Sequence, residues 1–404
     1  MSAPAPVRDL AARLAREDAL PAYVYDLTAL DAHAARIGAA LPPGVEWHYA
    51  VKANPDPALL RVIARHADGL EVSSGGELRH AAAAVPGHPL AFGGPGKTAA
   101  ELAAAVAAGA LVHVESPQEL RLLASVVRGL GGQARRAEPA VLLRVNLDVP
   151  VPASAGLVMG GGRGPFGMDR DGLDECAALL PGTGLRLRGL HAHLASGLGV
   201  RPALRAAAGV LRFARRWCDR QAVTEPVITL GGGMGVDYRR PGAVFDWTAY
   251  GRGLARLAGT AAARPGETLR IEPGRAVTAY CGWYVTRVLD VKRSGGAAFA
   301  VVAGGTHHLR TPAAKGHSQP FAVIGSDDWP HPWARPAVTG APVTLSGQLC
   351  TPKDVLARDV RVRRLRAGDL VAFAMAGAYA WNISHSRFLM HTEPGFHYIG
   401  EDVT

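Results

Sequence analysis

Up to Ile271, eight short apolar runs alternate with alanine-rich segments of helical character. Each run is continuously apolar, which is typical of strands buried on both faces of a parallel sheet. Eight strand–helix units that close on themselves form a (β/α)8 barrel, so we expect this α/β architecture. The predicted strands are Glu46–Val51, Gly69–Val72, Pro89–Phe92, Ala110–Val114, Ala140–Asn146, Leu185–His191, Val227–Leu230 and Leu269–Ile271. The predicted helices centre on Leu60, Leu78, Leu102, Leu120, Leu173, Leu211 and Leu254.

After Arg275 the pattern changes to β-rich segments separated by glycine and proline. The strands expected there are Val277–Lys292, Ala297–Val302, Pro342–Leu345, Val360–Arg363 and Leu370–Met375. This pattern predicts a second, antiparallel β domain. The early strand Ala22–Asp26 precedes the first barrel helix and is expected to join that domain. We therefore predict a barrel over residues 26–278 and a β-rich domain from residues 1–25 and 279–404.

Two further helices are expected before the first barrel strand. One covers Val7–Asp18, and the other runs to about Ala40 with Thr28 as its N-cap.

Polar or glycine-rich residues follow seven of the eight predicted barrel strands. In a barrel of this kind the carboxyl ends of the strands meet at one rim, where function is concentrated. The residues concerned are Lys52, Glu71, Ser73, Ser74, Gly93, Gly94, Arg144, Asn146, His191, His193, Ser196, Gly231, Gly232, Gly233, Glu272 and Arg275. Because they converge on one rim, we interpret them as one site.

Lys52 ends the first apolar run, Trp47–Val51. A lysine at the mouth of a barrel that loses solvation becomes a usable amine nucleophile. Taken alone, a lysine at the end of a strand more often simply reaches water. The neighbouring strand ends make the nucleophile the better interpretation.

Leu230 is followed by three glycines, whose backbone N–H groups can form a concave nest for a phosphate. A glycine turn is the plain alternative, and the loop lacks the GKS or GKT of a nucleotide-binding P-loop. Ser196 can add a hydroxyl group. Glu272 can hold a protonated ring nitrogen, although a structural pair with Arg275 is an equal alternative. A lysine, a phosphate nest, His193 and an acid for a pyridinium together indicate pyridoxal 5′-phosphate.

The motifs YAVKAN, EVSSGGEL, HAHLASG, LGGGMG, IEPGR, GQLCTPKD and MAGAY resemble those of the fold-type III pyridoxal-phosphate decarboxylases, from about Tyr23 to Tyr379. This family, which includes diaminopimelate, ornithine and arginine decarboxylases, has an alanine racemase-like barrel. The resemblance implies that Lys52 binds the cofactor aldehyde, that His193 stacks on the ring and that Glu272 pairs with the ring nitrogen. It also implies phosphate contacts from Ser196, Gly233 and Arg275. The wider set of implied cofactor residues adds Glu71, Arg144, Gly231, Gly232 and Tyr379.

The resemblance further implies a homodimer with shared active sites. Cys350 would be the proton donor after carbon dioxide leaves, and Cys350 and Asp354 would serve the Lys52 of the other copy. A carboxylate such as Glu272 at the ring nitrogen favours decarboxylation over racemisation.

Two departures from the simple amino-acid decarboxylases concern the substrate. Thr351 stands where diaminopimelate and ornithine decarboxylases have an acid that binds the far amino group. The segment Gly304–His317 carries five potentially cationic side chains: His307, His308, Arg310, Lys315 and His317. This combination suits a substrate whose far end is anionic. The expected substrate-binding residues are His307, His308, Arg310, Lys315, Thr351 and Asp354.

The segments GGTHHLRTP and MAGAYAWNISHSRFLMH resemble the siderophore-biosynthesis branch of the family, similar to enzymes that decarboxylate citryl-diaminopropionate in staphyloferrin B assembly. We therefore expect a lyase acting on a citrate-conjugated diamino acid. One alternative is a decarboxylase of diaminopimelate, ornithine or lysine. A second is a non-catalytic pyridoxal-phosphate-binding regulator with the same fold, which the presence of Lys52, Cys350 and Glu272 disfavours.

The net charge of +10 and a pI near 9.8 raise the question of nucleic acid. The arginines are spread through alanine-rich helices rather than gathered in a block, so attraction of an anionic small molecule is the better interpretation. The four cysteines contain no CxxC pair, which argues against a zinc site and suits a reducing cytoplasm. We expect no metal, no nucleic acid and no membrane partner.

Overall fold

The structure, a computed structural model, describes residues 2–130, 138–150, 156–260 and 265–400. The chain divides into two compact units, a barrel unit of residues 31–235 and 245–277 and a β unit of residues 1–30, 236–244 and 278–404. Residues 131–137, 151–155, 261–264 and the two ends of the predicted β domain, Met1 and 401–404, lie outside the description. Within the described part, no helix combines the length and apolar character that crossing a membrane requires.

The barrel unit is a closed ring of eight parallel strands, in the order β10-β11-β2-β3-β4-β5-β6-β8. Pairing of Leu269 with Val45 joins β11 to β2 and completes the ring. The strands are β2 (Val45–Ala50), β3 (Gly69–Val72), β4 (Leu90–Phe92), β5 (Leu111–Val114), β6 (Ala140–Arg144), β8 (Arg186–His191), β10 (Val227–Thr229) and β11 (Thr268–Ile271). Each lies within two residues of its predicted bounds, and the predicted barrel is confirmed.

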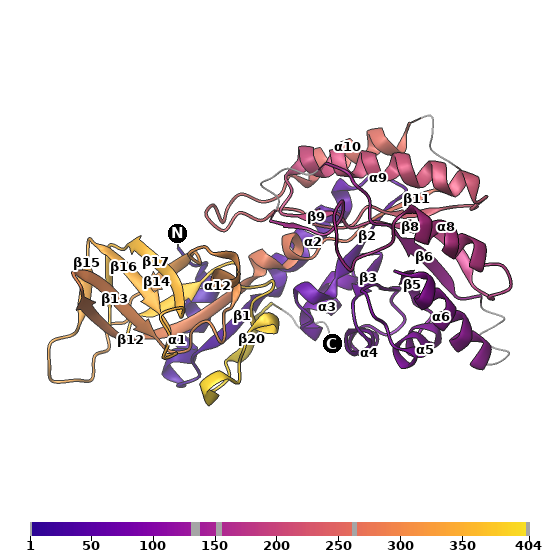
Figure 1. The fold of residues 1–404 in the computed structure, drawn as a ribbon. Coiled ribbons are helices and arrows are strands. Elements are labelled where there is room, and N and C mark those ends of the chain that lie inside the picture. The colour runs from indigo at the N-terminus through magenta and orange to yellow at the C-terminus, as the bar shows by residue number, and fades with distance from the viewer. Residues whose placement is uncertain (1, 131–137, 151–155, 261–264, 401–404) are drawn as a thin grey trace. The chain divides into compact units, whose positions relative to one another are not determined.

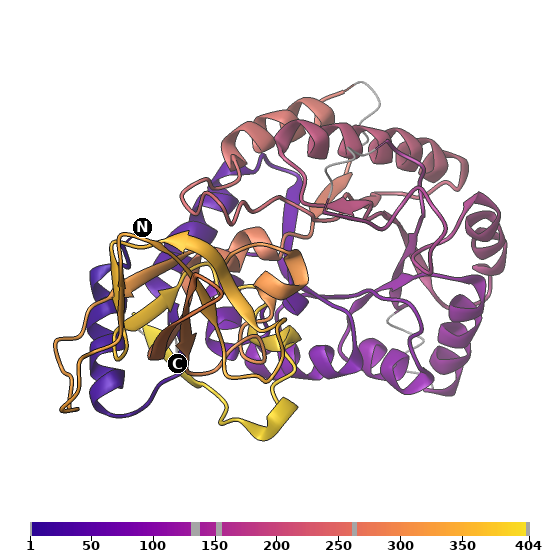
Figure 2. The ribbon, with the colours of Figure 1, turned by 60° about the vertical axis from the view of Figure 1, so that its left-hand side comes forward.

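Helices form an outer ring around these strands (Figure 2). They are α2 (Leu27–Ala40), α3 (Pro57–Ala64), α4 (Gly75–Ala84), α5 (Ala99–Ala107), α6 (Pro117–Gly129), α8 (Arg170–Leu179), α9 (Val200–Arg220) and α10 (Trp247–Ala258). Local side chains fix where several begin: Ser74, Thr98 and Ser116 each accept a backbone N–H of the first helical turn. Thr28 lies inside α2 instead of capping it, and Asp26 accepts the N–H of Ala29.

The β unit contains a mostly antiparallel sheet with the path β14-β19-β12-β13-β16-β17, and β1 lies between β12 and β20 (Figure 1). Its strands are β1 (Ala22–Asp26), β12 (Gly282–Ser294), β13 (Ala297–Val302), β14 (Phe321–Ile324), β16 (Pro342–Ser346), β17 (Val355–Arg361), β19 (Leu370–Phe373) and β20 (Gly395–Ile399). Val7, Leu10 and Leu14 of helix α1 (Ala5–Arg16) pack into a buried cluster with Val24 and Val285. The predicted second, antiparallel domain is confirmed as part of the fold.

The start of this unit differs from the sequence prediction. Residues expected to begin a strand at Val277 instead form the short helix α11 (Arg275–Thr278) and the 3₁₀ turn η2 (Ala279–Cys281). Strand β12 begins only at Gly282. There a Cβ atom would lie 2.3 Å from Gly377, so a close backbone approach fixes this position.

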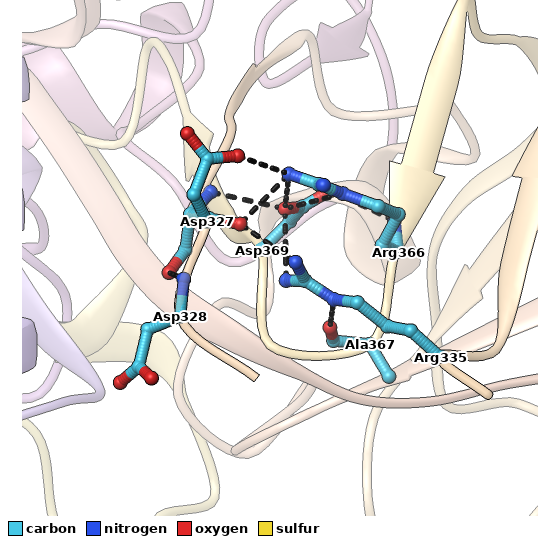
Figure 3. Close-up of polar contacts among 7 residues, drawn as sticks. Asp327, Asp328, Arg335, Arg366, Ala367 and Asp369 are labelled. Atoms are coloured by element: carbon cyan, nitrogen blue, oxygen red, sulfur yellow. Dashed lines mark hydrogen bonds and ion pairs between the residues drawn. The ribbon is translucent and has the colours of Figure 1, made fainter. Parts of the chain in front are cut away.

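Strand β15 (Ala337–Thr339) pairs with β18 (Arg364–Arg366). An ionic network secures the loop between β14 and β15. Asp369 is 1% exposed and accepts hydrogen bonds from the backbone of Ser326 and from the guanidinium groups of Arg335 and Arg366 (Figure 3). Arg335 and Arg366 each also donate to the carbonyl of Ser326. One buried carboxylate therefore joins both sides of the loop to the β18–β19 turn.

Candidate active site

Lys52 lies in the 3₁₀ turn η1 (Val51–Ala53) directly after β2. Its Nζ donates to Oε2 of Glu71 at 2.5 Å and to Oγ of Ser73 at 3.3 Å, both at the end of β3. The lysine side chain is 42% exposed, whereas that of Glu71 is 5% exposed. In the single chain, Lys52 therefore keeps part of its contact with water. Lys52 is held by a buried carboxylate, which fixes its amine at the rim.

His191 and Glu272 form a buried pair at the ends of β8 and β11. Nε2 of His191 lies 2.9 Å from Oε2 of Glu272, and both side chains are 4% exposed. Burial holds the pKa of His191 well below its ordinary value, so the imidazole is neutral and donates to the carboxylate. The other carboxylate oxygen, Oε1, is buried and has no hydrogen-bond partner among the described residues.

His193 presents a neutral ring beside this pair. The backbone N–H of Gly232 donates to its Nδ1 at 2.9 Å, which leaves the proton on Nε2 and fixes the ring orientation. Burial, with the nearby charge of Lys52 acting in the same direction, lowers the pKa of His193 to about 4. An uncharged imidazole suits stacking against a flat aromatic group.

The glycine loop after β10 packs tightly against its neighbours. Gly231 and Gly233 have φ of +73° and +87°, in the left-handed region that favours glycine. A Cβ atom on Gly232 or Gly233 would lie 2.0 Å from the carbonyl oxygen of Glu272 or Ala195, respectively. The N–H of Gly232 is already bonded to His193, so this group of the predicted phosphate nest orients the histidine instead.

Arg144 ends β6 and is 8% exposed. Its Nη1 donates to Oε1 of Glu115 at 2.6 Å, and Oε2 of Glu115 accepts the N–H of Gly167. The sequence analysis assigned no polar residue to the fourth strand end, yet Glu115 follows β5 there. The rule that polar residues collect after barrel strands would have found it. Arg275 begins α11 and is half-buried, and Ser196 lies in the two-residue strand β9 (Ala195–Ser196).

His113, His191 and Glu272 bring three metal-type ligand atoms within 4.8 Å of one another, all buried. No other such group was found among the residues that the structure describes. His191 and Glu272 are already joined by a hydrogen bond, so the group can serve as a hydrogen-bonded pair as well as a cation site.

The residues predicted to donate the proton and to bind the substrate lie in the β unit. Cys350 is exposed, and Thr351 is half-buried. Asp354 is 2% exposed and accepts hydrogen bonds from the backbone and hydroxyl of Thr306 and from the backbone of Leu349. These bonds give Asp354 a structural role, in which it joins the loop before β17 to the loop after β13.

The basic loop does not present five cations. His307 and His308 are almost fully buried, and burial lowers their pKa values to about 4 and about 3, so both are neutral near pH 7. Nη1 of Arg310 lies 3.0 Å from Nδ1 of His385. Lys315 is exposed at the end of α12 (Thr311–Lys315). Arginine, rather than the histidines, is therefore the cation that this segment offers near His385.

Tyr379 follows the MAGA segment with φ of +49°, and its carbonyl oxygen accepts the hydroxyl of Thr311. This bond ties the segment to the first turn of α12. The structure therefore brings Lys52, Glu71, His193, Gly231–Gly233 and Glu272 to one rim of the barrel, and groups Arg310, Tyr379 and Asp354 within the β unit.

Comparisons with known proteins agree with this geometry. A family model described as "Pyridoxal-dependent decarboxylase, pyridoxal binding domain" matches residues 27–279. The chain is 36% identical over 382 residues to the 2-[(L-alanin-3-ylcarbamoyl)methyl]-2-hydroxybutanedioate decarboxylase of Staphylococcus aureus, with 93% of each protein covered. It is 32% identical to the diaminopimelate decarboxylase of Deinococcus radiodurans, covering 93% of this chain and 88% of that protein. The crystal structure of diaminopimelate decarboxylase from M. jannaschi has a TM-score of 0.83 at 22% identity, covering 96% of this chain and 89% of that one, which shows likeness of fold.

Proposed function

The chain belongs to the pyridoxal-dependent decarboxylase family, and from that premise we propose that it removes the α-carboxylate of a citrate-conjugated diamino acid in siderophore biosynthesis. The name of the Staphylococcus aureus relative describes citrate joined through an amide to the side-chain amine of 2,3-diaminopropionate. We assign the same class of substrate to this carboxy-lyase, and pyridoxal 5′-phosphate as its cofactor.

The observation that carries the cofactor assignment is that Oε1 of Glu272 has no hydrogen-bond partner within the described parts of the chain. A buried carboxylate oxygen without a donor is costly, and a protonated pyridine nitrogen is a donor of the right charge. The neutral ring of His193 offers a flat face beside it. When bound, the cofactor supplies a sink for the electron pair that the departing carboxylate leaves behind.

Each remaining residue has a role that follows from its chemistry. Lys52 is the amine that would carry the cofactor aldehyde, with Glu71 and Ser73 holding it at the rim. Gly231, Gly233, Ser196 and Arg275 would hold the phosphate, while the N–H of Gly232 orients His193. Arg144, fixed by Glu115, would add a further polar side chain to the cofactor site. The exposed thiol of Cys350 would return a proton to the substrate carbon.

The substrate assignment is supported by Arg310, Thr351 and the Staphylococcus aureus relative. Arginine binds a carboxylate through two parallel hydrogen bonds, and Thr351 brings no negative charge that would repel it. Diaminopimelate, ornithine or lysine is the alternative class of substrate, and the Deinococcus radiodurans relative is its main support.

We also propose that the enzyme is a cytoplasmic homodimer with shared active sites. All four cysteines are unbridged and three are buried, as expected in a reducing compartment. In a shared site, Cys350 of one copy would serve Lys52 of the other.

The proposal is tested with the purified protein and added pyridoxal phosphate. We expect visible absorbance that borohydride removes, and carbon dioxide release that is faster from citryl-diaminopropionate than from diaminopimelate, ornithine or lysine. Lys52→Ala should lose both signals while it keeps the far-ultraviolet circular dichroism of the wild type. Absorbance without any carbon dioxide release would indicate the non-catalytic regulator, and faster release from a simple diamino acid would favour the alternative substrates.

A further inference from the structure

His191 lies behind the carboxylate that faces the proposed cofactor. It is the last residue of β8, and Glu272 follows β11, with β10 lying between these two strands in the barrel. Its Nε2–H is directed at Oε2 of Glu272 over 2.9 Å, while Oε1 of the same carboxylate has no hydrogen-bond partner in the part of the chain that the structure describes. Of the two oxygens of this buried carboxylate, Oε2 therefore accepts a hydrogen bond, and Oε1 accepts none from the described residues.

His113 of β5 keeps the His191 ring in place. Its centroid lies 4.2 Å from that of His191, with 30° between the ring planes. His113 is 0% exposed, and neither of its ring nitrogens has a hydrogen-bond partner among the described residues. Burial lowers the pKa values of both histidines well below the ordinary value. Two neutral, tilted rings therefore lie side by side in the barrel interior, and of these two His191 is the one that hydrogen-bonds the carboxylate.

We propose that His191 is a positioning residue for the cofactor: it holds Oε2 of Glu272 so that Oε1 receives the ring nitrogen, and it keeps the shared proton on that nitrogen. This inference rests on the proposed function, because it needs a pyridine ring at Glu272.

The physical reason is the preference of a hydrogen bond for one charge state. A donor to a carboxylate stabilises its charged form relative to its neutral form. Without His191, the buried carboxylate of Glu272 would lose its donor on one side, and the proton shared with the ring nitrogen would move toward the carboxylate. The ring would then be neutral and a poorer sink for electrons.

The test uses the holoenzyme loaded with pyridoxal phosphate labelled with ¹⁵N in its ring. The ¹⁵N chemical shift reports whether the ring nitrogen is protonated, and titration of the apoprotein gives the cofactor Kd. In His191→Leu we expect the ¹⁵N signal to move toward the unprotonated form and the Kd to rise about tenfold or more, as for the loss of a hydrogen bond to a charged group. His191→Gln keeps an N–H donor and should recover most of both signals.

His48→Leu is the matched control, since His48 is a second buried histidine in the same barrel, on β2, and its Nε2 approaches Oε2 of Glu46 at 3.8 Å. It should leave the ¹⁵N shift unchanged. If His191→Leu does not fold, His191→Phe makes the same comparison. An unprotonated ring nitrogen in the wild-type holoenzyme would by itself overturn the proposal.

The outcomes separate the two levels of inference. A wild-type protein that takes up no cofactor contradicts the proposed function. A wild-type protein that binds the cofactor and releases carbon dioxide, with a His191→Leu variant of unchanged ¹⁵N shift and Kd, contradicts only the role of His191.

Discussion

Arg310 donates its backbone N–H to Ser384 and approaches His385 with its guanidinium group, so two contacts hold it in one orientation. Losing a charged contact to a substrate typically costs about 2–5 kcal/mol. We expect Arg310→Ala to lower kcat/KM by tens- to thousands-fold for citryl-diaminopropionate, with a smaller loss for ornithine. Steady-state kinetics on both substrates measures the difference. Arg293→Ala, which removes an exposed arginine from β12, is the control. An equal loss on both substrates would argue against a carboxylate contact.

Thr351 is the residue at which the opposite change can be made. Thr351→Glu introduces an acid beside Cys350, so it should repel a carboxylate and attract an ammonium group. We expect the ratio of kcat/KM for citryl-diaminopropionate over diaminopimelate to fall. An unchanged ratio would place Thr351 away from the far end of the substrate.

Cys350 is an exposed thiol in a chain whose other three cysteines are buried. If it donates the proton that completes the reaction, Cys350→Ala should still release carbon dioxide while correct product formation slows by about 10²–10⁴-fold, in the range of general acids. Product analysis should then reveal by-products of transamination. Cys350→Ser keeps a weaker donor and should lie between the two. Unchanged rates and a single product in Cys350→Ala would exclude this role.

Among the elements, the loop between β14 and β15 depends most on one side chain. Asp369→Ala would leave Arg335 and Arg366, whose side chains are 12% and 15% exposed, without their shared buried carboxylate. Removing one partner of a buried ion pair typically costs about 3–5 kcal/mol, and we expect a loss of about 3 kcal/mol because both arginines can reach water. Urea denaturation measures it.

Asp327 provides the control for that measurement. It is fully exposed and pairs with Arg366 at 3.5 Å, within the same network (Figure 3). Surface pairs of this kind contribute little, so Asp327→Ala should leave the denaturation midpoint unchanged. Equal effects of the two substitutions would show that Asp369 does not carry the network.

The barrel strands could be predicted because each is a local apolar run with a turn or cap beside it. Strand β20 (Gly395–Ile399) could not, since its partner β1 is hundreds of residues away and its side chains alternate between half-buried and exposed. The burial of loop residues could not be predicted from the sequence either. His308 is enclosed because the Tyr23 hydroxyl donates to its carbonyl and Tyr284 contacts its ring nitrogen, and both tyrosines come from distant strands.

Within the site, residue types could be predicted but their partners could not. The motifs identified Lys52, His193 and Glu272, because strand ends in a barrel share one rim. The pairing of Lys52 with Glu71, and of Glu272 with His191, depends on side-chain directions at neighbouring strand ends. Spacing along the chain carries no such information.

For the whole molecule, the proposed shared site makes a prediction about mixed subunits. Lys52→Ala and Cys350→Ala proteins should each have little correct turnover, but a hybrid dimer regains one site with both residues intact. We expect activity to rise on mixing toward about one quarter of the wild type when subunits exchange at random, since on the order of half of the dimers are hybrids and each has one good site. Exchange confirmed by mass spectrometry without any recovery would contradict shared sites.

The position of β1 between β12 and β20 has a consequence for how the protein is made. On the ribosome, β1 emerges before the barrel, yet β12 begins only at Gly282 and β20 at Gly395. At typical synthesis rates of about 5–20 residues per second, β1 waits roughly 20–70 s for its last partner. During that time the apolar face of α1 and both edges of β1 are open to chaperones and to neighbouring nascent chains. Slower translation of the barrel would lengthen this exposure, so yield of the folded protein should depend on the speed of translation as well as on stability.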